Sequence, residues 1–502
     1  MSIIPQVYTF LQQLEAREIK VFQAGAYDTA WLAALRDSAD DSTAHPLFPQ
    51  SLEWLTTHQH ADGSWGAPWP YYHDRLLSTL RAVLTLHSWG RRTADKRQID
   101  LGLGYIWRNA GRQHSDPWET VGFELIFPTL LEQAEQAGLA LPYAAFADLQ
   151  TLRRAKLELI PPHLAYSRHT SLAMSLEMLG DTCDPNRLSE AQEANGGVSF
   201  SPSATAYVLQ HDPNNGTAYR YLQELTQGEA ADGSVPVAYP LEIFDESWSL
   251  RHLQHAVPQR DPGLIALMEP LAQRLNSEGT LSGWTSSAAV PVKESDTTGV
   301  CFAALSYLGY ELDPELLYQY EEPGHFRCYP FERNPSISAN IHVLDALHYC
   351  DPRESRSRIT KVIRFLRATR NSGGYWFDKW QVSPYYTTGH SVMAAHDIAP
   401  DLVEPAIQWM IHTQWADGSW GWFAPTLEET AYVVLAMLVW QRSGHAVPAG
   451  LIERGVEYLR RGFSPTAMDY PPLWICKTLF TPVRVVHGLL LATLLGCEAA
   501  GY

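Results

Sequence analysis

The sequence predicts an all-α fold assembled from a series of helical hairpins. Segments such as 76–86 and 430–440 place apolar residues at helical period, while strand signals are weak throughout. A Gly-Ser-Trp-Gly motif occurs twice, at 63–66 and 418–421, and looser copies of the same Gly-aromatic plan lie between them. In the second half the copies begin near residues 283, 329, 374 and 418. This period of about 45 residues suits one helical hairpin per repeat.

Each repeat has the same parts in the same order: a Gly-aromatic turn, an irregular loop, a Thr beside a small residue, and an apolar helix. Such hairpins stack either into an open solenoid or into a closed ring, and the repeat alone leaves both open. In a ring, equivalent loops converge on one end and share a cavity. Those loops carry the charged residues Asp296, Glu332, Arg333, Lys379, Glu428, Glu429 and Lys477.

Composition narrows the class of protein. The 502 residues suggest two or three domains, and a net charge of -18 argues against a nucleic-acid surface, which needs a basic stripe. None of the 6 cysteines has CxxC spacing, so no zinc site or redox pair is indicated. The N-terminus lacks a basic region followed by an apolar one, and the apolar stretch around 488–495 is far shorter than the ~20 residues that span a bilayer. We therefore expect a cytoplasmic protein without stable membrane insertion.

The loop VKESDTTG is the most informative of the set. Its Asp296 lies directly before an apolar helix, where an Asp or Thr commonly caps free backbone N–H groups. Alternatively, burial in an apolar cavity beside Glu294 would favour the neutral carboxyl form, which can act as a general acid. The 17 Trp, 24 Tyr and 16 Phe fit either a large core or a cavity walled by aromatic faces. The loop on its own leaves both readings open.

Six blocks in order resemble the class II diterpene cyclases, the copalyl diphosphate synthase group. The blocks are YDTAWLA at 27–33, FPQSLEW with QHADGSWG at 48–66, DRLLSTL at 74–80, GFELIFP at 122–128, SFSPSATA at 199–206 and YPLEIF at 239–244. Their order and spacing match from about residue 25 to residue 310, and PLW with Lys477 extends the match near the end. Single motifs of this kind are weak evidence, but six in order are strong.

The resemblance implies two α/α barrels, called β and γ, with γ inserted near the start of β and the active site between them. On that basis residues 1–45 are the N-terminal part of the β domain, 46–265 form the γ domain, and 266–502 complete the β domain. The repeat is thereby expected to close into rings.

The resemblance also assigns the acid. Asp296 falls on the middle Asp of the group's DxDD motif, the proton donor. Glu294 and Thr297 depart from that pattern; Glu294 is expected to raise or orient the acid, and Thr297 to cap the helix. Asn340 and His342 lie in an NxH segment similar to the group's. They are expected to orient the acid or take the final proton, unless they form a hydrogen-bonded core pair.

Diphosphate is expected near the boundary between the domains. Lys477, Arg333 and Arg327 are the candidate diphosphate-binding residues, as charged hydrogen-bond donors, with an ordinary ion pair as the alternative for each. Asp62 and Glu124 are candidates for holding Mg²⁺, which favours carboxylate and phosphate oxygens. For Asp62 a turn role is an equal alternative, since Asp-Gly is a turn signal.

The implied reaction is the protonation-initiated cyclisation of geranylgeranyl diphosphate by an isomerase of the intramolecular lyase type. The sequence has no DDxxD motif, so the product is expected to keep its diphosphate, as a labdane-, halimane- or clerodane-type compound such as kolavenyl or copalyl diphosphate. A class I terpene synthase or a phosphatase would act downstream. Cyclisation of farnesyl diphosphate to drimenyl diphosphate stays open because the acid motif is altered.

Two other classes also stay open. A carbohydrate-active α/α barrel would need paired carboxylates, for which Glu428 and Glu429 are the candidates. A non-catalytic helical repeat that binds a partner would leave Asp296 without a chemical role. Squalene-type cyclases share the acid motif but are longer and carry an apolar membrane-docking helix, which this sequence does not show.

Overall fold

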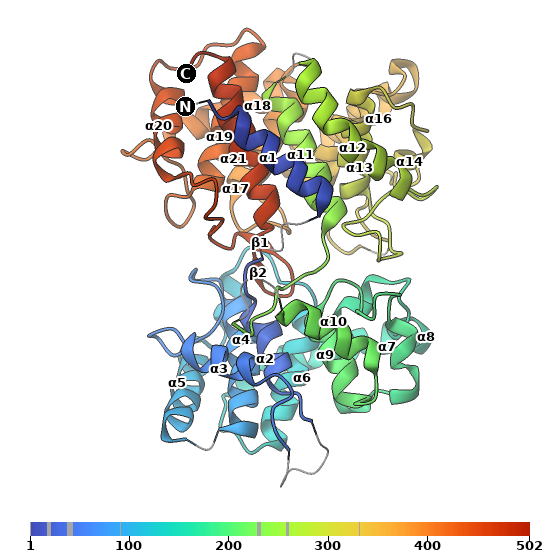
Figure 1. The fold of residues 1–502 in the computed structure, drawn as a ribbon, viewed down its shortest axis with the longest axis vertical. Coiled ribbons are helices and arrows are strands. Elements are labelled where there is room, and N and C mark those ends of the chain that lie inside the picture. Colours follow the sequence, from blue (N-terminus) through green and yellow to red (C-terminus); the bar gives the residue numbers. More distant parts are fainter. Residues whose placement is uncertain are drawn as a thin grey trace.

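The computed structural model describes residues 2–17, 22–37, 44–90, 92–227, 232–257, 261–330 and 332–502. Helices dominate it and gather in two bodies stacked along the long axis of the molecule (Figure 1). The upper body in that view contains both ends of the chain, and the lower body contains α2 to α10. A short antiparallel hairpin of β1 (Trp474–Ile475) and β2 (Leu479–Phe480) lies between them. The all-α expectation is confirmed.

The upper body is a closed ring of helices. Each inner helix packs against the next, and the last, α21, packs back against the first, α11. An open solenoid has no such closing contact, so the expectation of a ring is confirmed. In the described chain the inner helices are α11 (Glu242–Ala256), α13 (Ser295–Leu308), α15 (Ile337–Leu347), α17 (Pro384–Ala395), α19 (Leu427–Arg442) and α21 (Val483–Ala499).

An outer layer of helices covers this ring. All of α15 is buried, whereas α16 buries only Ser355, Val362 and Leu366, because a covering helix needs just one apolar stripe. Polar residues that α15 buries must therefore find partners inside the ring. The outer helices are α1 (Ile4–Ala16), α12 (Pro262–Glu278), α14 (Glu315–Tyr318), α16 (Pro352–Thr369), α18 (Pro400–His412) and α20 (Leu451–Gly462).

The lower body repeats this plan with shorter elements. Its inner elements also pack in a closed series, and they are α2 (Ala26–Ala33), α4 (Tyr72–Trp89), α6 (Phe123–Gln136), the 3₁₀ segment η3 (Ser171–Thr182) and α9 (Pro202–His211). The covering elements are α3 (Pro49–Thr57), α5 (Thr93–Asn109), α7 (Ala147–Leu159), α8 (Pro162–Ala165) and α10 (Gly216–Thr226), with the 3₁₀ turns η1 (Arg112–Ser115), η2 (Tyr143–Phe146) and η4 (Pro185–Ala191).

The repeated Trp fastens each hairpin. Its indole N–H donates to a carbonyl near the end of the preceding outer helix over 2.7–2.8 Å, in Trp65, Trp284, Trp376 and Trp420. Its backbone N–H donates to the Thr hydroxyl in the first turn of the next inner helix, as from Trp284 to Thr298 at 3.0 Å. Gly283 makes the turn before it with a φ of +93°, which favours glycine. The repeat seen in the sequence is therefore a clamp between consecutive helices.

The two hydrophobic cores divide the chain differently from the expected limits. The upper core joins residues 3–14 to residues 243–497, and the lower core lies within residues 26–235. The chain therefore changes body between 14 and 26 and again between 235 and 243, and not at 45/46 and 265/266. The limits are corrected because the block at 27–33 belongs to α2, which packs against α4 and α9 of the lower body.

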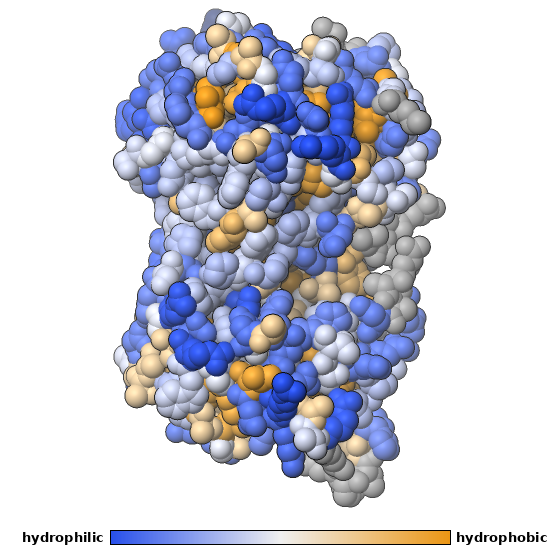
Figure 2. All heavy atoms as spheres, turned by 90° about the vertical axis from the view of Figure 1, so that its left-hand side faces the viewer, coloured by the Kyte–Doolittle hydropathy of each residue, from blue (hydrophilic) through white to orange (hydrophobic). Residues whose placement is uncertain are grey.

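The surface is mostly polar. Figure 2 shows a face on which hydrophilic residues cover most of both bodies and apolar residues form small separate patches. In the part of the chain that the structure describes, every helix is too short or too polar to span a bilayer.

Candidate active site

A cavity of about 350 Å³ lies between the two bodies, beside the β1–β2 hairpin. Most of its wall is apolar, and both bodies contribute to it. Aromatic faces suit a cationic guest, and an apolar wall keeps water from reaching it. The aromatic lining residues are Phe200, Phe244, Tyr329, Trp380, Trp474 and Phe480.

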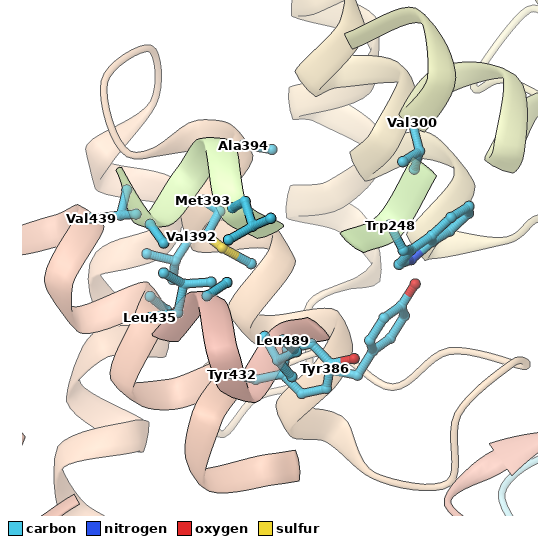
Figure 3. Packing of buried hydrophobic residues seen from close by; sticks show 14 of the residues in the cluster. Trp248, Val300, Tyr386, Val392, Met393, Ala394, Tyr432, Leu435, Val439 and Leu489 are labelled. Carbon is cyan, nitrogen blue, oxygen red and sulfur yellow. The ribbon is translucent and has the colours of Figure 1, made fainter. Parts of the chain in front are cut away.

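A further layer of aromatic rings backs this wall. Trp248 of α11 and Tyr386 of α17 point toward one another inside the upper ring (Figure 3). Trp248 packs against Phe244 with ring centroids 4.0 Å apart, and Tyr386 packs against Trp474 at 4.7 Å. The cavity wall is thus held by rings from opposite sides of the barrel.

Asp296 brings an acid to this cavity. It lies in the first turn of α13 and lines the cavity, with 14% of its side chain exposed. Glu294 caps the helix, because its carboxylate accepts the backbone N–H of Asp296 at 2.5 Å and that of Thr297 at 3.0 Å. The capping role therefore belongs to Glu294, which corrects the expectation for Thr297. The Asp296 carboxyl group is left facing the cavity.

Glu294 and Asp296 place two carboxyl groups at the start of α13. Burial raises the pKa of Glu294 to about 8, and the charge of Asp296 adds to the rise. Glu294 therefore keeps its proton at neutral pH, and it lines the cavity beside Asp296. A proton held next to Asp296 at a mostly apolar cavity suits general acid chemistry.

His342 reaches Asp296 from the neighbouring inner helix, α15. Its Nδ1 lies 2.5 Å from Oδ1 of Asp296, and only 4% of its side chain is exposed. Its ring packs edge-on against Trp248 at 5.3 Å between centroids. The imidazole therefore fixes the direction of the carboxyl group, which fits the orienting role expected for His342.

Asn340 has a different place from the one expected. Its side chain accepts the backbone N–H of Phe326 at 2.8 Å and donates to the carbonyls of Phe326 at 2.9 Å and Ser336 at 2.7 Å. These bonds are the counterpart of those that Thr298 makes in the preceding repeat. Asn340 therefore fastens its own loop, and the expectation that it orients Asp296 is corrected.

A second cavity, of about 470 Å³, adjoins the first and shares Glu124 and Trp380 with it. Its lining is polar. Arg333 lines it with 57% of its side chain exposed and lies 3.2 Å from Glu119. Lys379 lines it as well. Lys379 pairs with Glu332, and the lining also carries the carboxyl groups of Asp116, Glu119 and Glu124, so both signs of charge meet at this cavity.

Lys477 and Arg327 line neither cavity. Lys477 is fully buried, and its Nζ donates to Glu177 at 2.6 Å and to Ser203 at 2.7 Å. Arg327 donates to Glu322 at 2.8 Å. Both cations already have partners away from the cavities, so the expectation that they bind diphosphate is corrected. Lys477 instead joins the hairpin of the upper body to the lower body.

The predicted Mg²⁺ pair does not meet in one place. Asp62 lines neither cavity; it accepts hydrogen bonds from Ser64 and lies 2.6 Å from Arg75. Glu124 lines both cavities, beside Glu119, and pairs with Lys156. Asp62 and Glu124 therefore do not fit a shared metal site. Within the described ranges, no group of three or more His, Cys, Asp or Glu side chains is arranged to hold a metal ion.

Glu428 and Glu429 are engaged in packing. Glu428 accepts the indole N–H of Trp474 at 2.8 Å, and Glu429 accepts the hydroxyl of Ser383 at 2.5 Å. Burial raises the pKa of Glu428 to about 8 and that of Glu429 to about 7. Neither residue lines a cavity described above, so they do not flank a substrate position as glycosidase carboxylates do.

Several residues of the site were missed in the sequence. Glu119 stands five positions before Glu124, and the run from Asp116 to Glu124 is rich in acids, which is a usable signal. Lys379 lies on one of the repeat loops, but no sequence feature distinguished it from the other Lys and Arg residues as a binding residue. His390, which contacts His342, lies on a separate helix and carries no local signal.

Known proteins resemble this chain over much of its length. The pattern of the squalene-hopene cyclase C-terminal domain matches residues 333–463. The chain is 36% identical over 486 residues to the type B diterpene cyclase of Mycobacterium tuberculosis (strain ATCC 25618 / H37Rv), covering 93% of this chain and 94% of that protein. A chloroplastic (-)-kolavenyl diphosphate synthase of Tripterygium wilfordii is 30% identical over 386 residues, 75% of this chain. The match covers 45% of that protein, so this chain spans about half its length.

A solved structure shares the whole architecture. The ent-copalyl diphosphate synthase from Streptomyces platensis superposes with a TM-score of 0.82 and 26% identity, covering 98% of this chain and 99% of that chain. The resemblance found in the ordered sequence blocks is thereby confirmed. An acid in an aromatic cavity between two closed helical rings, with similarity over nearly the full length of a bacterial relative, leads to one conclusion: this chain belongs to the class II diterpene cyclases.

Proposed function

We propose that this cyclase protonates the terminal alkene of geranylgeranyl diphosphate and releases a bicyclic diterpenyl diphosphate of the labdane, halimane or clerodane type. The observation that carries the proposal is the position of Asp296: a carboxyl group next to Glu294, whose pKa burial raises to about 8, facing a mostly apolar, aromatic cavity. Protonating an alkene creates a tertiary cation that water would quench, and the wall of this cavity is mostly apolar. The relatives named for kolavenyl and copalyl diphosphate support a C20 diphosphate substrate.

The two adjoining cavities fit the two ends of such a substrate. The polar cavity, with Arg333 and Lys379, would take the diphosphate, and the apolar cavity would fold the hydrocarbon chain against Asp296. A cavity of about 350 Å³ lies in the range of small-molecule sites. The cation would then move along aromatic faces and fixed dipoles until a proton leaves.

Mg²⁺ is proposed at the polar cavity, on Glu119 and Glu124. Burial and the neighbouring Glu124 raise the pKa of Glu119, so a divalent cation would relieve a repulsion between two carboxyl groups. Mg²⁺ is commonly held by one or two carboxylates together with substrate phosphates. When bound, it would neutralise diphosphate charge. Asp62 has no part in this arrangement.

The retained diphosphate makes the reaction an isomerisation, and a class I terpene synthase or a phosphatase is the proposed consumer of the product. A cytoplasmic location is likewise kept as a prediction. The consumer of the product and the location of the protein do not depend on the geometry of the site.

The test is incubation of the protein with C15, C20 and C30 isoprenoids, in particular farnesyl and geranylgeranyl diphosphate, with phosphatase treatment and mass spectrometry of the products. We expect a bicyclic C20 alcohol from the wild type and none from Asp296→Ala at an unchanged fold. Turnover of farnesyl diphosphate alone would replace the C20 substrate with the C15 one. Activity of Asp296→Ala equal to that of the wild type would overturn the proposal.

A further inference from the structure

A chain of three histidines leads away from Asp296 into the interior of the upper ring. His342 Nδ1 lies 2.5 Å from Asp296 Oδ1, and His342 Nε2 lies 2.9 Å from His390 Nδ1. His390 Nε2 then lies 3.4 Å from His252 Nε2. The three imidazoles are 7% exposed or less, so the chain is enclosed by protein.

The row of three histidines runs along the axis of the upper barrel, and its last contact crosses the barrel interior. Inner helices alternate with outer ones, so all inner helices point the same way. Asp296 lies in the first turn of α13, His342 and His390 lie in the second turns of α15 and α17, and His252 lies in the last turns of α11. The imidazoles therefore descend from the cavity end of the barrel toward its far end, and the last contact crosses from α17 to α11.

Of the three histidines, His390 and His252 are neutral because they are buried. Burial lowers the pKa of His390 and of His252 well below the ordinary value, nearby imidazoles lower both further, and Arg251 adds to the lowering for His252. A neutral imidazole carries one N–H and one lone pair. Two opposite sets of tautomers satisfy every contact. In the set that fits an ionised Asp296, the N–H of His252 donates to His390, that of His390 to His342, and that of His342 to Asp296.

In that set of tautomers, one ring nitrogen has no hydrogen-bond partner in the part of the chain that the structure describes. The Nδ1 of His252 is buried and has no hydrogen-bond partner among the described residues. It borders a small cavity of about 10 Å³, the size of a single water molecule. Arg251, His255 and Asp345 line the same cavity, with Arg251 2.5 Å from Asp345 and His255 3.7 Å from it. The chain thus ends at a polar cluster with room for a proton-delivering water.

The neighbours of this cluster extend toward the surface. Arg251 also donates to the hydroxyl of Tyr349 at 3.3 Å, and Tyr349 is 39% exposed. On the next turn, His348 lies 3.6 Å from Asp397, whose side chain is 55% exposed. Ionisable groups therefore connect the small cavity to the end of the barrel that lies away from the lower body.

We propose that His342, His390 and His252 form a proton-return path that recharges Asp296 between turnovers. The inference deepens the proposed function and rests on it. Each cycle transfers the Asp296 proton to a substrate carbon, and a different C–H proton leaves to a base and solvent. One proton must therefore come back to the Asp296 carboxylate in each turnover.

The return is a concerted shift of protons without net oxidation. The N–H proton of His342 moves to Asp296, that of His390 moves to His342, and that of His252 moves to His390. Water or hydronium at the small cavity supplies Nδ1 of His252, so the enzyme regains the one proton it gave. The imidazoles end with their protons on the opposite nitrogens, and they reorient about their side-chain bonds before the next cycle.

The test separates the first turnover from later ones. In His390→Gln the amide keeps hydrogen bonds but does not relay protons, so an enzyme with Asp296 already protonated should complete one turnover at the wild-type rate. Later turnovers should slow about a hundredfold, the usual scale of a lost proton transfer. Rapid-quench measurement of product from geranylgeranyl diphosphate would show a burst of one product per active site. His252→Gln, at the far end of the path, should give the same burst.

The matched control is His487→Gln. His487 is also buried in an inner helix of the same ring, where it contacts Tyr470 at 2.7 Å, but it lies outside the path. It should show neither burst nor slow phase. Exogenous imidazole should restore the steady rate of His390→Ala, and circular dichroism checks that each variant is folded.

Two results overturn the proposal. Equal slowing of first and later turnovers in both His390→Gln and His252→Gln would reduce the chain to a positioning role, and unchanged steady rates would assign the return to another route. Product deuterium gives a second measure: in D₂O the wild type should place about one deuteron per product over many turnovers, as a solvent-recharged acid requires. A wild type that turns over no isoprenoid diphosphate would refute the proposed function itself, which is a separate failure.

Discussion

The cavity around Asp296 and the cavity around Arg333 share a wall, yet their linings are opposite in character. The first is walled by aromatic rings and holds its acid in a buried, capped and hydrogen-bonded position. The second is lined by partly exposed charges on loops. On the proposed function, this difference separates the groups that act on the hydrocarbon from the groups that bind the diphosphate. Substitutions in the first should act on the rate of the bound substrate, and substitutions in the second on its binding.

The largest effect is expected at the acid. Asp296→Asn removes the transferable proton while it keeps the shape of the side chain, so kcat for diphosphate cyclisation should fall about 10³–10⁴-fold. Ser295→Ala, one position earlier and more deeply buried, is the control and should keep its activity. Product quantification by gas chromatography gives both rates. Comparable losses in the two variants would mean that disturbance of α13, and not the lost proton, explains the effect.

The contact between the two bodies comes next. Lys477→Met leaves Glu177 as an unpaired charge at a fully buried site, which should lower the free energy of unfolding by about 3–5 kcal/mol. Denaturant titration followed by circular dichroism measures the change. The double variant Lys477→Met with Glu177→Leu should recover most of the loss, because no buried charge is then left alone. Failure of the double variant to recover would assign the loss to packing of the hairpin.

The polar cavity should respond with a binding effect. Arg333→Gln removes one charged donor from a half-exposed position, so KM for geranylgeranyl diphosphate should rise about tenfold with little change in kcat, and less at high salt. Arg327→Gln is the matched control, since Arg327 is a paired cation outside both cavities. A loss of kcat at constant KM in Arg333→Gln would contradict the division of roles.

The smallest effect concerns pH. Burial raises the pKa of Glu294 to about 8, so loss of this proton beside Asp296 should halve kcat/KM near that pH and lower it further above. In Glu294→Gln this group no longer titrates, so the alkaline limb near pH 8 should be lost. An unmoved limb would place the titration on another group.

The titration of Glu294 should also change the free energy of unfolding with pH. The folded-state pKa of Glu294, about 8, lies above the ordinary 4.5, so the folded protein binds this proton more tightly than the unfolded chain does. Its contribution is therefore full below pH 4.5 and lost as pH rises toward 8. Urea unfolding of wild type and Glu294→Gln at a series of pH values should differ in slope across this window.

The fold was largely predictable from the sequence, and the site only in part. The Trp and Thr that hold each hairpin together lie close in sequence and recur in each repeat. The repeat could therefore be found without any knowledge of distant contacts. Asp296 and His342 were found because each stands in a recognisable motif. Lys477 stood in a motif too, but its partner Glu177 is 300 positions away, and no local pattern reveals that a cation is already paired.

Asn340 illustrates a second limit. Its position in the repeat is the one that Thr298 and its counterparts occupy, which favours a clamp role, while its place beside His342 favoured a role at the acid. The direction of the side chain decides between them, and a helix changes that direction by a large angle over two residues. The predicted limits between the two bodies were wrong for a similar reason. The sequence of helix α2 does not show which of the two rings the helix packs into.

Ring closure has a consequence for the order in which this chain folds. The lower core uses only residues 26–235, so it can form as soon as that segment has left the ribosome. The upper ring cannot close until α21 has been made, because α11 and α1 both pack against it. For the time needed to synthesise the roughly 240 residues from the end of α11 to the end of α21, at about 5–20 residues per second, the face of α11 that packs against α21 lacks its partner. A cell that makes this enzyme must therefore protect a half-built ring beside a finished one.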